Sequence, residues 1–192
     1  MHAIAIASAK RPHKRWRIAG FTFLGLVALL ALLLATPPAR DHERVALLLL
    51  YAQQQPPPPW LARLVTYEVE ETSFIISSPQ GEIPCRLYTP RGIANPPALL
   101  LLHGVHHLGI DEPRMMNFAR AFAASGVTVM TPQLTELIDY RIEPVTVANI
   151  GIAARELSLR LHQPRIGLMG LSFAGGLALL AVVSVSTRYL TP

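Results

Sequence analysis

The sequence predicts an α/β protein whose mostly parallel sheet is layered with helices and follows a single transmembrane helix. Residues 18–35 form a long uncharged apolar run, which is typical of a membrane-spanning helix. Residues 65–90 contain two neighbouring alternating segments, which predict two paired strands. Short apolar runs then alternate with helical stripes up to the end of the sequence. This alternation is the pattern of βαβ units around a layered sheet.

Residues 18–36 are predicted to be a transmembrane signal anchor, because eighteen helical residues span about 27 Å, close to the apolar thickness of a bilayer. Residues 1–17 form a basic tail with five positive charges: Lys10, Arg11, Lys14, Arg15 and Arg17. Positive residues before a span favour a cytoplasmic N-terminus. The expected localisation is therefore single-pass in the membrane, with the globular part outside the cytoplasm.

A cleaved signal peptide is the alternative to an anchor. Cleavage after Ala39 leaves Pro37 at the −3 position, where a small residue is preferred, so the uncleaved anchor fits better. Residues 37–64 then form a Pro/Gln-rich linker, in which four consecutive prolines at 56–59 favour an extended spacer. Residues 65–192 form the globular domain.

The net charge of +5 does not indicate a nucleic-acid-binding protein. Seventeen basic residues face twelve acidic ones, and five of the basic residues lie before residue 18, so the rest of the chain is neutral. Cys85 is the only cysteine, which excludes an intrachain disulfide and argues against a cysteine-based metal site. We expect no metal, no cofactor and no nucleic-acid partner.

The strands and helices of the domain follow in order. Residues 65–77 and 81–90 predict the first two strands, and the apolar run 97–104 predicts a strand covered on both faces. Asp111 is expected to cap a helix that carries one apolar stripe and ends at Gly126; the stripe is Met115, Phe118, Ala119 and Phe122.

Two further strand-helix pairs complete the pattern. Residues 127–134 predict a strand, 146–162 a helix, and 165–170 the last strand, with a third helix from Phe173 onward. The acidic residues between the fourth strand and the second helix are expected on a solvated loop; they are Glu136, Asp139 and Glu143. His162 at the end of that helix is expected to be structural.

The segment from Gly170 to Ala174, "GLSFA", is a near match to the G-x-S-x-G pattern. In that pattern a serine lies on a strained strand-to-helix turn, so that its hydroxyl is exposed. Strand and helix pass so closely there that the flanking positions need small side chains, here Gly170, Ala174 and Gly175. Ser172 is therefore the candidate nucleophile, and the backbone N–H of Phe173 is a candidate oxyanion donor.

A second motif agrees with the first. His103 and Gly104 follow the predicted third strand directly, in "LLLLHGVHH". This loop is where a second oxyanion donor is expected, and the backbone N–H of Val105 is the candidate. His103 and Gly104 are expected to support the loop.

With "HG" after one strand and "GLSFAGG" after another, residues 65–185 resemble the α/β-hydrolase family, in its dienelactone hydrolase and esterase-like branches. The resemblance implies an eight-stranded sheet and a triad in the order serine, acid, histidine. It implies that this chain holds the N-terminal part of such a sheet, about five strands and three helices. The family's acid and histidine follow the seventh and eighth strands, so only Ser172 and the oxyanion loop can be carried over.

Residues before Ser172 offer alternatives. His106, His107 and Asp111 lie on the loop near the expected site, where a substitute base is conceivable because triads are defined by their roles. The same residues with His103 suggest a metal cluster, although no regular spacing supports it.

The resemblance implies a serine hydrolase that cleaves a small carboxylic ester through Ser172. We expect the chain to be truncated and inactive alone, because no Asp, Glu or His follows Ser172. The alternative is a scaffold or binding protein, or one half of a split hydrolase that a complementary chain completes. The membrane, through residues 18–36, is the other expected partner.

Overall fold

The computed structural model describes residues 13–34, 36, 42, 44–46, 48–50, 58–60, 63 and 66–190. The chain divides into two compact units, residues 1–42 and 43–192. Most of the predicted basic tail and most of the predicted linker lie outside the described residues, so those assignments stay predictions.

The first unit contains helix α1, His13–Leu34, which covers most of the segment predicted to span the membrane. Its residues 20–32 are all exposed, and Phe21 is the most exposed large apolar side chain among them, at 71%. Among the described residues, no helix meets the length and hydropathy that a membrane span requires.

The second unit is built around a five-stranded sheet with the order β1-β2-β4-β3-β5. The strands are β1 Val69–Ser78, β2 Gly81–Pro90, β3 Ala98–Leu102, β4 Thr128–Pro132 and β5 Gly167–Gly170. The first two pair antiparallel with each other, β2 pairs antiparallel with β4, and β3 pairs parallel with both β4 and β5. The prediction of five strands in an α/β layered sheet is confirmed.

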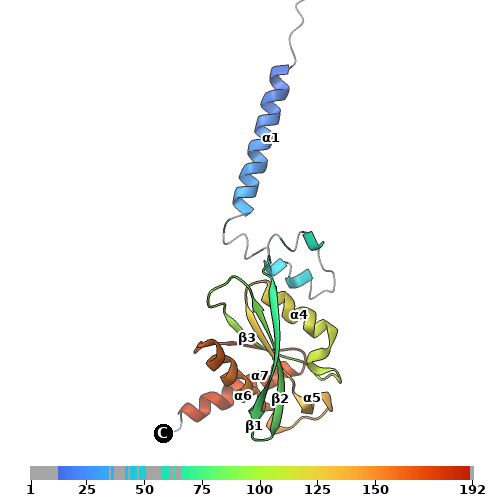
Figure 1. The fold of residues 1–192 in the computed structure, drawn as a ribbon, viewed down its shortest axis with the longest axis vertical. Helices are drawn as coiled ribbons and strands as arrows, with labels where there is room; N and C mark the ends of the chain where they lie inside the picture. Colours follow the sequence, from blue (N-terminus) through green and yellow to red (C-terminus); the bar gives the residue numbers. More distant parts are fainter. Residues whose placement is uncertain are drawn as a thin grey trace, which may run out of the picture. The chain divides into compact units, whose positions relative to one another are not determined.

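Helices cover both faces of the sheet (Figure 1). On one face α6, Pro144–Leu161, and α7, Ala174–Leu190, bury side chains of four strands; the central residues of this core are Ile76, Cys85, Leu100, Leu102, Met130, Ile150, Leu157 and Leu177. On the other face α4, Pro113–Ala124, packs Met115, Ala119 and Ala123 against Tyr88, Leu101 and Val129. The apolar runs of β3 and β4 read as continuous because both faces of these strands are covered.

The cap of α4 differs from the prediction. Asp111 lies in a short 3-10 helix, η1 Gly109–Asp111, and the N-cap of α4 is Glu112, whose carboxylate accepts the Met115 N–H at 2.8 Å. Pro113 at the first helical position requires the extended backbone that Glu112 has, which places the cap one residue later. The expected end is confirmed, since Gly126 follows the helix with φ 104°.

The prediction that the acidic residues after β4 lie on a solvated loop is wrong for Glu136. Glu136 belongs to a short helix, α5 Thr135–Ile138, and is only 8% exposed. One of its carboxylate oxygens accepts a hydrogen bond from the Asn149 side chain at 3.3 Å. Asp139 and Glu143 do lie near solvent, where both pair with Arg141. The third helix also begins later than predicted, at Ala174 instead of Phe173.

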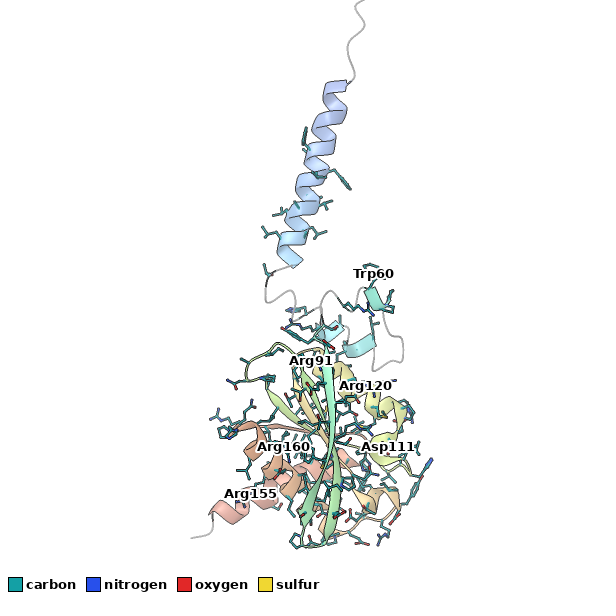
Figure 2. The ribbon with its side chains drawn as sticks, in the orientation of Figure 1. Trp60, Arg91, Asp111, Arg120, Arg155 and Arg160 are labelled. Carbon is teal, nitrogen blue, oxygen red and sulfur yellow. The ribbon has the colours of Figure 1, made fainter. Side chains whose placement is uncertain are left out.

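Surface contacts tie α6 to the antiparallel strands. The guanidinium of Arg160, labelled in Figure 2, lies 3.9 Å from the centre of the Phe74 ring of β1. Arg160 also pairs with Glu156 one turn earlier at 2.8 Å. A cation over an aromatic face is attracted by the ring quadrupole, so this contact helps to hold α6 over β1.

Candidate active site

Ser172 occupies the turn between β5, which ends at Gly170, and α7, which begins at Ala174. Its φ is 53°, in the left-handed region that residues other than glycine rarely adopt, and its side chain is exposed. Such a conformation costs about 1–3 kcal/mol and persists only where the surrounding structure holds it. Ser172 is therefore an exposed residue that the surrounding structure holds in a strained turn.

The close approach of strand and helix explains the small residues around Ser172. A Cβ added at Gly170 would lie 2.2 Å from the Ala174 carbonyl carbon and oxygen and 2.5 Å from the Gly175 nitrogen. A Cβ at Gly175 would meet the Gly170 oxygen at 3.4 Å, which is ordinary contact. Gly170 is thus the position where the geometry excludes every side chain, and Ala174, fully buried, fits where the motif has a second glycine.

The two predicted motifs meet in space. A Cβ at Gly104 would lie 3.2 Å from the Leu171 carbonyl oxygen and 3.5 Å from the Cβ of Ser172. The Leu171 N–H donates to the Leu102 carbonyl at 3.0 Å, which joins the ends of β5 and β3. The carboxyl ends of adjacent parallel strands reach the same edge of the sheet, and this brings the "HG" loop against the serine.

Two backbone donors remain at this edge. Ala174 and Gly175 donate to the carbonyls of Leu171 and Ser172, which starts α7. Within the described part of the chain, the N–H groups of Val105 and Phe173 donate no backbone hydrogen bond outside regular helices and strands. Phe173 directly precedes α7, at the positive end of its dipole, and Val105 follows Gly104, which lies against Ser172.

His103 is a structural histidine. Its ring is 2% exposed, and its Nε2 accepts the Leu134 N–H at 2.9 Å, so that nitrogen carries no proton. Its Nδ1 then donates to the Gly104 carbonyl oxygen at 2.8 Å. Because a trans peptide is planar, this bond turns the Val105 N–H away from the ring. Burial lowers the pKa of the imidazole and keeps it neutral.

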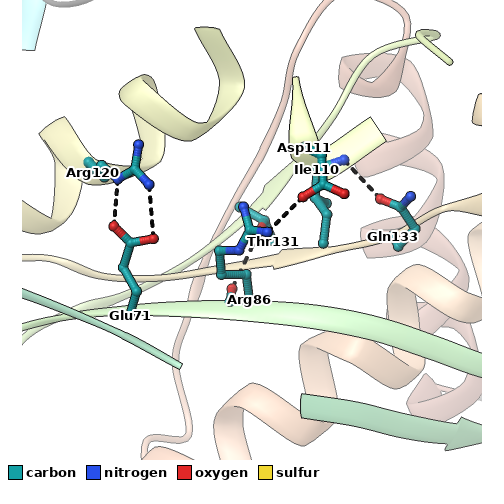
Figure 3. A network of polar contacts seen from close by, with 7 residues as sticks. All are labelled: Glu71, Arg86, Ile110, Asp111, Arg120, Thr131 and Gln133. Atoms are coloured by element: carbon teal, nitrogen blue, oxygen red, sulfur yellow. Dashed lines mark hydrogen bonds and ion pairs between the residues drawn. The ribbon is translucent and has the colours of Figure 1, made fainter. Parts of the chain in front are cut away.

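A second set of polar contacts holds the loop further along, and sequence reasoning missed it. The Gln133 side chain accepts the Ile110 N–H at 2.8 Å, and the Asp111 carboxylate pairs with Arg86 of β2 at 2.6 Å (Figure 3). Glu71 and Arg120 form a neighbouring bidentate pair between β1 and α4. The position of Gln133 directly after β4, at the same sheet edge as His103, was the available signal.

The other loop histidines make local contacts, and Asp111 pairs with an arginine of β2. His106 and His107 stack on each other with ring centres 4.5 Å apart, and the His106 Nδ1 accepts the Leu108 N–H at 3.2 Å. Asp111 is paired with Arg86. In the part of the chain that the structure describes, no three histidine, cysteine or acidic side chains come together to hold a metal.

A cavity of about 940 Å³ opens beside Ser172. The oxyanion loop, the start of α4 and the end of β5 form its walls; its apolar lining is Val105, Pro113, Met115, Phe118 and Leu171. Polar side chains reach it from His106, Glu112, Arg114 and Asn117, and Glu112 pairs with Arg114 at 2.6 Å. The cavity therefore combines an exposed serine with a mainly apolar wall and no unbalanced charge.

The strand order, the serine turn and the loop after β3 together define the α/β-hydrolase fold. Solved structures of esterases and of a dienelactone hydrolase share this fold with the chain. No family model matches the sequence, and no curated protein matches it.

Three of these structures set the scale of the likeness. A Pyrobaculum calidifontis esterase is 18% identical to this chain, with a TM-score of 0.55. The matched region covers 79% of this chain and 47% of the esterase. The bacterial brefeldin A esterase, a homologue of human hormone-sensitive lipase, is 21% identical, with a TM-score of 0.54. The matched region covers 64% of this chain and 37% of that esterase. Dienelactone hydrolase from Anabaena variabilis is 18% identical, with a TM-score of 0.53. The matched region covers 63% of this chain and 60% of the hydrolase. The chain thus spans less than two thirds of the length of each.

Proposed function

We propose that the chain carries the nucleophile and oxyanion hole of a serine hydrolase that cleaves small carboxylic esters through Ser172. The observation that carries this proposal is the left-handed backbone of Ser172, with φ 53°, on an exposed turn that lies against Gly104 of the "HG" loop. A fold accepts such strain at a serine where the position of the hydroxyl matters. The likeness to esterases supports the ester as substrate class.

The chemistry follows from the geometry. The Ser172 Oγ attacks the ester carbonyl carbon, and the carbonyl oxygen gains negative charge as the tetrahedral intermediate forms. The N–H groups of Val105 and Phe173 stabilise that charge, with the N-terminal dipole of α7 behind them. Collapse of the intermediate expels the alcohol and leaves an acyl-serine, which water hydrolyses to release the acid.

A base must take the serine proton during acylation and a proton of the attacking water during deacylation. His103 does not supply it, since both its ring nitrogens are engaged by the backbone. No Asp, Glu or His follows Ser172 in the 192 residues. These residues thus provide no assigned acid-base pair for Ser172, and we expect them alone to be nearly inactive.

A fluorophosphonate reagent tests the role of Ser172 without needing turnover. We expect the full chain in detergent to form a phosphonyl adduct that peptide mass spectrometry places on Ser172. Labelling should be slow and should accelerate with pH, because hydroxide replaces the missing base. Oxyanion hole and binding alone give about 10³–10⁴-fold acceleration over water in a serine protease stripped of its triad.

Ser172→Gly is the matched control. Glycine adopts a positive φ without strain, so this variant keeps the turn while it removes the hydroxyl. The variant should fold and remain unlabelled. An adduct on another residue, or equal labelling of the variant, would refute Ser172 as the nucleophile.

The second candidate is a chain that binds instead of catalysing, as a scaffold or as one half of a split hydrolase. This candidate is favoured because the serine and the backbone N–H groups are present, whereas no acid or histidine follows Ser172. A complete absence of Ser172 labelling, with the fold intact, would favour the scaffold.

A further inference from the structure

A second cavity, of about 530 Å³, lies between the β1-β2 hairpin, α5 and the start of α6. Ser78 and Ile83 line it from the hairpin, and its buried polar lining is Glu136 and Asn149, each only 8% exposed. It shares no lining residue with the cavity beside Ser172. The proposed hydrolase function therefore makes no use of this second cavity.

The Glu136 carboxylate has one oxygen without a partner. Its Oε1 accepts the Asn149 side-chain N–H at 3.3 Å, whereas its Oε2 is buried and has no hydrogen-bond partner among the described residues. A buried carboxylate is strongly destabilised when one of its oxygens finds no donor. The buried part of the second cavity therefore offers a negative charge and an unused acceptor.

Asn149 and Ser78 add further acceptors next to Glu136. The Ser78 Oγ lies 3.0 Å from the Asn149 Oδ1 and 2.8 Å from the Gln80 Oε1. A hydroxyl has a single proton, so it can serve only one of these two oxygens at a time. The other oxygen stays open to a donor from outside the chain.

The basic residue of the lining, Arg141, does not supply the missing partner. Its guanidinium pairs with Glu143 at 2.8 Å and with Asp139 at 3.0 Å, and its side chain is 53% exposed. Glu82 adds an exposed carboxylate at the mouth of the second cavity. Three carboxylates and one guanidinium thus line the cavity, which leaves a formal charge of −2.

The dipole of α6 does not offset this charge at Glu136. Val145, in the first turn of α6, lines the second cavity, and the start of a helix favours negative groups. That effect falls off within the first turn, whereas Asn149, which bonds Glu136, is the sixth residue of the helix. A positively charged donor is therefore the group that the second cavity lacks.

The lining also distinguishes between kinds of cation. Divalent metal ions need several ligands at once, and in the described part of the chain no three histidine, cysteine or acidic side chains converge in this way. A primary ammonium group carries one positive charge and three N–H donors, which match carboxylate, amide and hydroxyl oxygens. Ile83 and Val145 add apolar surface that suits a short alkyl chain.

We propose that the second cavity binds a small primary alkylammonium ion. Its N–H groups donate to the Glu136 carboxylate and to the side-chain oxygens of Asn149 and Ser78, and its alkyl chain lies against Ile83 and Val145. The site is separate from the serine site and does not depend on the proposed hydrolase function.

A ligand-observed NMR titration of the full chain in a non-ionic detergent tests the site, with n-butylammonium chloride as the probe. We expect saturable binding with a Kd of about 1 mM or tighter. Tetramethylammonium chloride is the matched control ligand, because it has the same charge and no N–H donor. It should bind at least about tenfold more weakly, since charge-assisted hydrogen bonds are lost.

Glu136→Gln is the variant that decides the proposal. Glutamine keeps the size of the side chain and an oxygen for Asn149, but it removes the charge, so butylammonium affinity should fall at least about tenfold. Glu156→Gln is the matched control, because Glu156 lies on α6 outside the cavity lining and pairs with Arg160. This control should keep the wild-type affinity.

Glu82→Lys at the exposed mouth of the cavity gives a second test if Glu136→Gln fails to fold. It reverses a charge there and should weaken butylammonium binding by at least about threefold. Unchanged binding in Glu136→Gln, or equal binding of tetramethylammonium, overturns the ammonium site. Binding of Mg²⁺ or Ca²⁺ without butylammonium, or no saturation up to about 10 mM butylammonium, overturns it as well.

Discussion

Gly170 lies where β5 and α7 approach each other most closely, so a substitution there tests whether the serine turn depends on that close approach. Gly170→Ala places a Cβ 2.2 Å from backbone atoms of Ala174, which no side-chain movement relieves. We expect a loss of about 3 kcal/mol in the free energy of unfolding, because strand and helix must separate. Urea denaturation of the full chain in detergent measures it.

Gly176 provides the control for that substitution. A Cβ at Gly176 meets nothing within 4 Å, and the residue lies inside α7. Gly176→Ala should therefore stabilise the protein by about 0.5–1 kcal/mol through helix propensity. Equal tolerance of alanine at both positions would contradict the close approach on which the serine turn depends.

Because His103 is buried, we predict that the free energy of unfolding of the protein depends on pH. Burial lowers the pKa of its imidazole below the ordinary value of 6.5, so the unfolded state binds the proton more readily than the folded state. Stability from His103 is therefore fully present above about pH 6.5 and is lost as the pH falls below it. The slope for one such group reaches about 1.4 kcal/mol per pH unit at most.

The measurement is the unfolding free energy between pH 5 and 8. His103→Gln should be less stable than the wild type at pH 8, since two backbone hydrogen bonds weaken, and should lose less stability on acidification. A wild-type slope in His103→Gln would show that another group titrates.

At the scale of elements, the membrane assignment of residues 18–36 is a proposal supported by sequence. The segment carries no charge, and a basic cluster precedes it. Replacing Leu26 and Leu30 with arginine should release the chain from membranes in carbonate extraction, because each central arginine costs about 2.5–3.5 kcal/mol of insertion. Leu26→Ile with Leu30→Ile keeps the hydrophobicity and should stay bound. Retention of the arginine variant would reject the anchor.

The elements also differ in how far local sequence decides them. Alternation and apolar runs located all five strands within a few residues, since both patterns depend on which faces are buried. The N-cap of α4 was misplaced by one residue because Pro113 limits the backbone of the residue before it. Glu136 was assigned to solvent because a carboxylate rarely enters a core, and the fold buries it beside Asn149 of α6.

At the scale of the whole molecule, Cys85 reports unfolding. The thiol is 2% exposed in the core, and burial raises its pKa to about 12. At pH 8 a thiol reagent should therefore react only when the sheet opens, and the reaction should accelerate in parallel with the loss of circular dichroism in urea. Reaction of the folded protein at the rate of a free thiol would contradict the buried position.

The candidate site was predictable in part. Ser172 and the "HG" loop were found because each lies just after a strand, and strand ends in a parallel sheet share one edge. Gly170 was found because the tight turn around Ser172 needs a small side chain there. The hydrogen bond from His103 to the Gly104 carbonyl was not predictable. It depends on a second hydrogen bond, from Leu134 to the other ring nitrogen, and Leu134 lies 31 residues away. The pairing of Arg86 with Asp111 was not predictable for the same reason, because strand order sets it and sequence spacing does not encode strand order. Gln133 offered a signal through its position directly after β4, but its partner Ile110 did not.

Sequence by itself determined the α/β layering, the serine turn and the absence of an acid or histidine after Ser172. These depend on local periodicity, on small side chains at a tight turn and on composition, all of which are read along the chain. Only the tertiary structure decided that the loop after β3 meets the serine, that backbone groups hold both ring nitrogens of His103, and that Glu136 is buried beside Asn149. Those features arise where distant segments pack together, and the free energy of that packing is not carried by any one segment.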